Sequence, residues 1–228
     1  MKTFFTALFI CLKFAANADD SGMHIEHDAT WQQILDKAKK ENKYILLDAY
    51  ASWCGPCKWL AKEVFPKPEV GAAVNPYYIS AKIDMEKGEG LELAKKYNVR
   101  NYPTYLFFDA NGELVHRSLG SMPASDFITL CTNTLNPDKQ FITLKKKYLS
   151  GNRDTSFLRM FALNANDAQD SVAQPALKEF LAAVNNELSP ANIQLIAYTT
   201  NTLQDYGYDI IQQNKEKFYE VLGKNQVN

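Results

Sequence analysis

Two cysteines near the middle of the first half of the chain have the types and spacing needed to make and break a disulfide bond. Cys54 and Cys57 are separated by Gly-Pro, follow the apolar run Tyr44–Tyr50 and precede a helix-forming segment, Lys58–Val64. Cys54 lies where backbone N–H groups and the helix dipole stabilise a thiolate. Cys57, one helical turn further on, can reach back to resolve a mixed disulfide on Cys54. The sequence therefore predicts a redox-active Cys54–Cys57 disulfide.

The residues around this pair resemble those of thioredoxin. Asp48 lies six residues before Cys54 within the apolar run, where that family keeps a buried carboxylate beneath the second thiol. Lys82 matches the family lysine beside this carboxylate, and Tyr102–Thr104 matches the turn whose proline is cis. The resemblance implies an α/β thioredoxin fold, in which helices flank a mixed central sheet.

Further landmarks extend the resemblance over residues 24 to 135. Asn111-Gly112 is a hairpin signal between two predicted strands, and Gly120 follows shortly after them. Glu63–Phe65, and an aspartate two residues after Lys82, look more like the thioredoxin-like domains of periplasmic thiol:disulfide interchange proteins than like cytosolic thioredoxin.

The resemblance also implies a catalytic role for each of four residues. Cys54 attacks a disulfide of the substrate as a thiolate, and Cys57 completes the exchange after losing its proton. Asp48 accepts that proton directly or through a water, and we expect burial to raise its pKa. Lys82, close to the carboxylate, tempers this rise.

Substrate contacts are expected on the other side of the sulfur atoms. Pro103, if cis, leaves the backbone of Tyr102 free to pair with an extended segment of the substrate. Trp53 and the turn around Gly120 flank the same groove. The Gly-Pro pair between the cysteines resembles the reducing members of the family. Tyr102 departs from the small residue common before the cis proline, which affects both the redox potential and the choice of substrate.

The first 18 residues have the pattern of an export signal. A short positive start, Met1-Lys2, precedes the apolar stretch Thr3–Leu12, and Ala16–Ala18 is an A-x-A cleavage site. We therefore expect a mature protein that begins near Asp19 and works outside the cytoplasm or in the periplasm. The apolar stretch is about half as long as a bilayer requires, so we do not expect it to remain as a membrane span.

Composition narrows the classes of partner. Without Lys2 and Lys13 the 25 basic residues fall to 23 against 26 acidic ones, a net charge near −3 that argues against nucleic acid. Three cysteines remain after residue 18, which is too few for a protein that relies on disulfides for stability. We therefore expect the Cys54–Cys57 pair to take part in a reaction rather than to stabilise the fold. No cofactor or metal is expected. The expected partners are exported proteins with disulfides and a membrane electron donor.

Periodicity predicts a thioredoxin-like domain over residues 19–136 and an all-helical domain over 137–228. In the first domain Asp28 caps a helix, Pro66 and Pro68 interrupt the pattern, and Cys131 falls on the apolar face of the last helix. The second domain has no Cys, His or Trp, and its apolar spacing predicts four or five short helices. The expected elements of the first domain are helices at 28–41, 58–64, 90–97 and 123–135 and strands at 44–50, 77–83, 104–109 and 113–118.

Three alternatives remain open at this point. The cysteine pair could form a structural disulfide, or it could bind zinc together with His24 and His27, since His-x-x-His and Cys-x-x-Cys can close a tetrahedral site. Neighbours in an extended segment point in opposite directions, however, and a solvated histidine pair is the commoner case. The chain could also be a client-binding or scaffold protein in which the helical domain has the main role.

Overall fold

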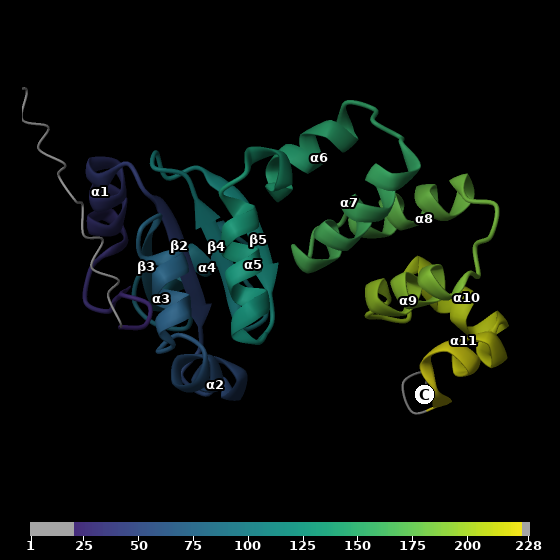
Figure 1. Cartoon of the computed structure of the whole chain (residues 1–228), viewed down its shortest axis with the longest axis horizontal. Coiled ribbons are helices and arrows are strands. Elements are labelled where there is room, and N and C mark those ends of the chain that lie inside the picture. The colour runs from purple at the N-terminus through teal and green to yellow at the C-terminus, as the bar shows by residue number, and fades with distance from the viewer. Residues whose placement is uncertain (1–20, 225–228) are drawn as a thin grey trace, which may run out of the picture.

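A mixed five-stranded sheet forms the centre of the first half of the chain in the computed structural model, which describes residues 21–224 (Figure 1). The strand order is β1-β3-β2-β4-β5; β1, β3 and β2 are parallel, whereas β4 runs antiparallel to both β2 and β5. The strands are β1 (Ile25–Glu26), β2 (Tyr44–Tyr50), β3 (Tyr78–Asp84), β4 (Thr104–Phe108) and β5 (Leu114–Leu119). This is the α/β architecture that the sequence predicts.

Helices cover both faces of the sheet, and each face has its own core. Alternate residues of β2 point to opposite faces, so Leu46 packs beneath α2, α3 and α5 while Ile45 and Leu47 pack beneath α1 and α4. The helices of this half are α1 (Trp31–Glu41), α2 (Gly55–Glu63), α3 (Pro68–Val74), α4 (Gly90–Lys96) and α5 (Ala124–Thr134). Cys131 is completely buried on α5, which confirms that it is a core residue, and burial raises the pKa of its thiol.

Two details of the helices differ from the sequence prediction. The N-cap of α1 is Thr30 rather than Asp28: the Thr30 hydroxyl accepts the Gln33 N–H, and the Gln33 side chain accepts the Thr30 N–H in return. Pro66 and Pro68 were expected only to interrupt the pattern, but Pro68 begins α3, since the first helical position needs no N–H.

The second half of the described chain is helical, with more helices than the four or five expected. A 3₁₀ turn at Pro137–Lys139 leads into six α-helices. Ser189 caps α9, because its hydroxyl accepts the N–H of Asn192. A single core joins these helices and includes the stacked rings of Phe157 and Phe161. The helices are α6 (Phe141–Leu149), α7 (Thr155–Asp167), α8 (Ala173–Ala183), α9 (Pro190–Thr199), α10 (Tyr206–Gln213) and α11 (Lys215–Leu222).

The expected export signal at residues 1–18 lies outside the described residues. Between residues 21 and 224, no helix has both the length and the apolar character that crossing a bilayer would require. A division of the chain near residue 136 stays a prediction.

The helical half is anchored to strand β5 of the sheet. α6 and α7 pack against this strand, which is the edge of the sheet that faces the green helices in Figure 1. The first backbone N–H of α6, from Phe141, donates to Nδ1 of His116 at 3.0 Å. Arg117 donates to the carbonyl oxygens of Tyr97 and Asn98 at 2.8 and 3.1 Å, which anchors β5 to the end of α4.

The buried histidine at this junction predicts acid sensitivity of the fold. Burial lowers the pKa of His116 from 6.5 to about 4. At this site the unfolded chain therefore binds more protons than the folded chain between these values, and the contribution of His116 to the free energy of unfolding falls by about 3 kcal/mol as the pH drops through this window. Urea unfolding at pH 7 and pH 4.5, compared between the wild type and a variant without the imidazole, measures this loss.

His116→Gln removes the titrating group and is expected to lose less stability over the same pH interval. The exposed His27 provides the control, because His27→Gln should keep the wild-type pH dependence. Equal pH dependence in wild type and His116→Gln would contradict the prediction.

Candidate functional site

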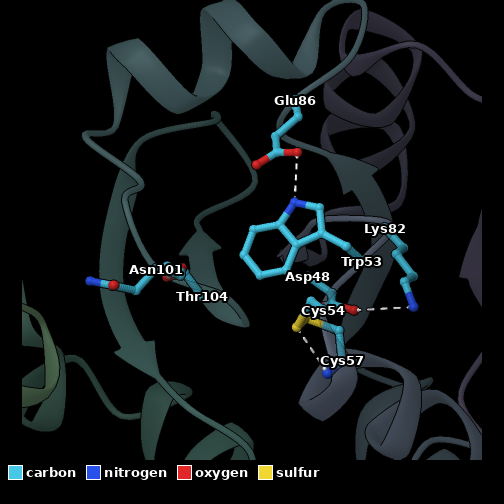
Figure 2. Close-up of a disulfide and its surroundings, with 8 residues drawn as sticks. All are labelled: Asp48, Trp53, Cys54, Cys57, Lys82, Glu86, Asn101 and Thr104. Carbon is cyan, nitrogen blue, oxygen red and sulfur yellow. Dashed lines mark hydrogen bonds and ion pairs between the residues drawn. A yellow bond between two sulfur atoms is a disulfide. The ribbon is translucent and has the colours of Figure 1, made fainter.

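The first turn of helix α2 carries a disulfide bond between Cys54 and Cys57 (Figure 2). The sulfur atoms are 2.02 Å apart, and the two Cα atoms are 5.3 Å apart. Cys54 is the N-cap of α2, and Pro56 occupies the first turn, where its missing N–H is not needed. The pairing that the sequence predicts is therefore present.

Position in the helix distinguishes the two sulfur atoms. The Cys57 backbone N–H donates to Sγ of Cys54 at 3.1 Å. A thiolate on Cys54 would accept this hydrogen bond and lie at the positive end of the helix dipole. Cys57 lies within the helix and has no such position. Both cysteines are buried in the oxidised state, with exposed fractions of 2% and 1%. The helix start, rather than exposure, thus favours Cys54 as the nucleophile.

Figure 2 shows a buried carboxylate, Asp48, beside the disulfide. Asp48 is in the middle of β2 and is only 1% exposed. Burial raises its pKa from 3.8 to about 6, and the charge of Lys82 on the neighbouring strand opposes this rise. The Lys82 Nζ is 3.8 Å from the Asp48 Oδ2, a contact between charges that is too long for a hydrogen bond. Asp48 can therefore exchange a proton near neutral pH.

Lys82 separates this carboxylate from a surface pocket. The Lys82 Nζ lies over the ring of Tyr50 at 4.6 Å from its centroid, and its side chain is 13% exposed. The pocket has a volume of about 500 Å³ and is bordered by Cys57 and Lys58 as well as by Lys82. Solvent can thus approach the second cysteine from this side.

An exposed indole lies over the other side of the disulfide. Trp53 is 66% exposed, and its Nε1 donates to Oε2 of Glu86 at 2.8 Å, as Figure 2 shows. The rings of Trp53 and Tyr102 meet edge to face, with their centroids 5.8 Å apart. Tyr102 itself packs against the buried cysteines. These two rings form an apolar rim beside the sulfur atoms.

The turn before β4 closes the site. The Tyr102–Pro103 peptide bond is cis. The carbonyl of Pro103 accepts the N–H of Gly120 at 2.9 Å, which joins this turn to the end of β5. Gly120 has a φ of +92°, a conformation that favours glycine. A chain of contacts therefore brings together every residue that the sequence assigned to the site.

Glu86 is a site residue that the sequence analysis missed. It follows the end of β3, just as Trp53 follows the end of β2, and the two strands are parallel neighbours. Since the carboxyl ends of parallel strands meet at one edge of the sheet, this order was the available signal. Lys87 extends the contact, because its Nζ donates to the Ser52 Oγ at 3.4 Å.

The histidines of the alternative zinc site lie in the segment around β1. The ring Nε2 of His24 is 2.8 Å from the hydroxyl of Ser21, and its backbone N–H donates to Asn75. His27 is exposed. Within residues 21–224, no three or more His, Cys, Asp or Glu side chains are grouped so that they could hold a metal ion.

Comparison with known proteins identifies the first half of the chain. Residues 31–134 match the model of the thioredoxin-like domain. The chain is 35% identical over 97 residues to thioredoxin-2 of Pyricularia oryzae, a match that covers 42% of this chain and 53% of that protein. It is 33% identical over 146 residues to protein disulfide-isomerase of Drosophila melanogaster, covering 63% of this chain and 28% of that protein.

A third relative is the thiol:disulfide interchange protein DsbD of Pseudomonas fluorescens. It is 29% identical over 123 residues, which cover 53% of this chain and 21% of that protein. The chain thus spans about half the length, or less, of these relatives. Together with the sheet, the cysteine pair and the buried carboxylate, the matches show that residues 31–134 are a thioredoxin-like domain.

Proposed function

We propose that this protein is a thiol–disulfide oxidoreductase that works through Cys54 and Cys57. The observation that carries the proposal is the cysteine pair at the start of α2, with the Cys57 N–H directed at the sulfur of Cys54. A thiolate there attacks a substrate disulfide because the thiolate, not the thiol, is the nucleophile. The names of the relatives, which include a thiol:disulfide interchange protein and a disulfide-isomerase, support the same chemistry.

The exchange proceeds in two steps that balance electrons and protons. The Cys54 sulfur forms a bond with one substrate sulfur and breaks the substrate disulfide, releasing the first substrate thiolate. The Cys57 thiol then gives its proton to Asp48, and its sulfur attacks Cys54, which frees the second substrate thiolate. The domain ends oxidised, and the two substrate thiolates become a dithiol by taking up the proton held on Asp48 and one proton from solvent. Trp53, Tyr102, Pro103 and Gly120 form the surface on which the substrate segment lies.

The direction of electron flow that we propose is reduction of disulfides in exported proteins. Export rests on the pattern of residues 1–18 in the sequence. An exported dithiol would be oxidised by its surroundings unless it were reduced again, so the proposal includes a membrane electron donor. Lys82 stabilises ionised Asp48, which can then accept a proton from Cys57 when the domain reduces a substrate.

A reduction assay and a redox titration test the proposal together. Wild-type protein should speed the reduction of insulin by dithiothreitol. Equilibration with dithiothreitol buffers should give a potential near that of thioredoxin, about −270 mV. A potential near about −120 mV, as in strong oxidants, would overturn the reducing direction. No acceleration of insulin reduction would favour the client-binding alternative over an enzyme.

A further inference from the structure

A row of three polar side chains crosses the face of the sheet beneath α2. In the strand register, Asp48 on β2 lies opposite Lys82 on β3 and opposite Tyr105 on β4. Directly opposite residues of neighbouring strands point to the same face of a sheet. Tyr105 is accordingly part of the same core as Leu46, on the side that α2 and α5 cover. The buried carboxylate therefore has a tyrosine as its neighbour on the side away from Lys82.

The hydroxyl of Tyr105 is buried without a hydrogen-bond partner among residues 21–224. The side chain is 0% exposed, and its ring packs edge to face on Phe127 of α5, with the centroids 5.3 Å apart. Tyr78, a buried tyrosine of the same core, is different: its hydroxyl donates to the carbonyl of Cys131 at 2.7 Å. Leaving a buried hydroxyl unpaired costs about 1–3 kcal/mol, so an unpaired one calls for an explanation.

The Asp48 carboxylate, in turn, lacks a hydrogen-bond donor within residues 21–224. Neither of its carboxylate oxygens accepts a hydrogen bond from the described part of the chain. The two groups are also coupled by charge. Burial is the main cause that raises the pKa of Tyr105, and the Asp48 carboxylate raises it further. A free donor and a free acceptor thus lie on one buried face, opposite each other in register.

Among the residues that the structure describes, few other ionisable groups face the Asp48 carboxylate. Lys82 approaches from β3, and the Cys54–Cys57 disulfide at the start of α2 is drawn beside Asp48 in Figure 2. From α5, the Cys131 thiol lies near Tyr105, and burial raises the pKa of this thiol so that it stays neutral. Ser80 of β3 adds one more buried hydroxyl without a partner in the described residues, but it does not titrate. Tyr105 is therefore the neutral donor of this set that lies directly opposite Asp48.

We propose that Tyr105 is a positioning residue for the proton step, and that its hydroxyl donates through one buried water to the Asp48 carboxylate. A donor at this place favours the ionised carboxylate, which is the form that accepts the proton of Cys57. The proton moves from the Cys57 sulfur to an Asp48 oxygen, and the sulfur then attacks Cys54. The role of this contact in turnover rests on the proposed function, whereas the contact itself does not.

Titration of Asp48 in the oxidised full-length chain tests the contact without any turnover. The chemical shift of the Asp48 carboxyl carbon, followed by NMR in protein labelled at aspartate, gives the pH midpoint of the Asp48 titration directly. Tyr105→Phe keeps the ring on Phe127 and removes only the hydroxyl, and it should raise this midpoint by about one pH unit. Tyr78→Phe is the matched control: it removes a buried tyrosine hydroxyl from the same core and should leave the midpoint unchanged.

The pH profile of the second exchange step tests the consequence for the reaction. With a preformed mixed disulfide on Cys54, Tyr105→Phe should shift the pH midpoint of resolution upward by the same amount as the NMR midpoint. In an Asp48→Asn background, Tyr105→Phe should produce no further shift. An Asp48 midpoint that is unchanged in Tyr105→Phe, or a profile shift that persists in the Asp48→Asn background, overturns the inference. Failure of the proposed function would instead show as wild-type protein that reduces no disulfide, while the NMR result would still stand.

Discussion

Replacing Cys54 with serine is expected to reduce insulin reduction to the rate of dithiothreitol alone. A serine hydroxyl is not ionised at neutral pH and cannot form a mixed disulfide, so neither exchange step can begin. The buried Cys131 cannot substitute, since its thiol is 0% exposed and burial raises its pKa. The turbidity of precipitating insulin chains measures the rate.

Replacing Cys57 provides the matched variant. Cys57→Ser should also lose turnover, but it should hold a covalent mixed disulfide with a substrate, because Cys54 can still attack and nothing resolves the product. Mass spectrometry of the non-reduced protein detects this adduct. If the adduct instead formed on Cys57 of the Cys54→Ser protein and not on Cys54, the roles assigned to the two sulfur atoms would be wrong.

Replacing Asp48 with asparagine is expected to make the oxidised protein more stable at pH 8 by up to about 3 kcal/mol. The folded-state pKa is raised from 3.8 to about 6, so the folded chain binds more protons than the unfolded chain between these values. The contribution of Asp48 to stability is therefore fully present below pH 3.8 and is lost as the pH rises through about 6. The variant has no carboxylate to ionise, and its advantage should disappear near pH 4. Urea unfolding at both pH values measures the difference.

The same substitution should slow the second exchange step. Without the carboxylate, nothing buried accepts the Cys57 proton, and the rate at pH 7 should fall about a hundredfold, as is typical when a general base is removed. The deficit should shrink at high pH, where hydroxide removes the proton. Asp126 is exposed on α5, so Asp126→Asn is the control and should change neither stability nor rate. A less stable Asp48→Asn protein at pH 8 would contradict the argument from burial.

The central sheet and its site were largely predictable from the sequence because local signals agree there. The run Tyr44–Tyr50 is apolar at every position but Asp48, and the structure places a strand at the same residues. The Asn-Gly turn set the hairpin of β4 and β5, where the observed ends differ by one residue from the prediction. Asp48 stood out because a carboxylate inside such a strand is costly unless it has a function.

The features that were missed depend on competition between signals or on contacts distant in sequence. The sequence predicts only an interruption at Pro68, because proline as a residue type can either end a helix or begin one. Asp28 can cap a helix, but the N-cap of α1 is Thr30, because only Thr30 has a glutamine, Gln33, three residues later that completes a capping box. In the sequence, Tyr105 is indistinguishable from the other aromatic residues of a buried strand. Its place opposite Asp48 follows only from the register of β2 with β4.

The position of the helical half affects how the sheet meets other molecules. A sheet edge exposes backbone N–H and C=O groups that can recruit a strand from another chain. One edge here is β1, which has only two residues, and the other is β5, against which α6 and α7 pack. Within residues 21–224, neither border of the sheet exposes a long unpaired strand, so two copies of this part of the chain are discouraged from joining their sheets into a continuous fibre-like stack, even when crowded.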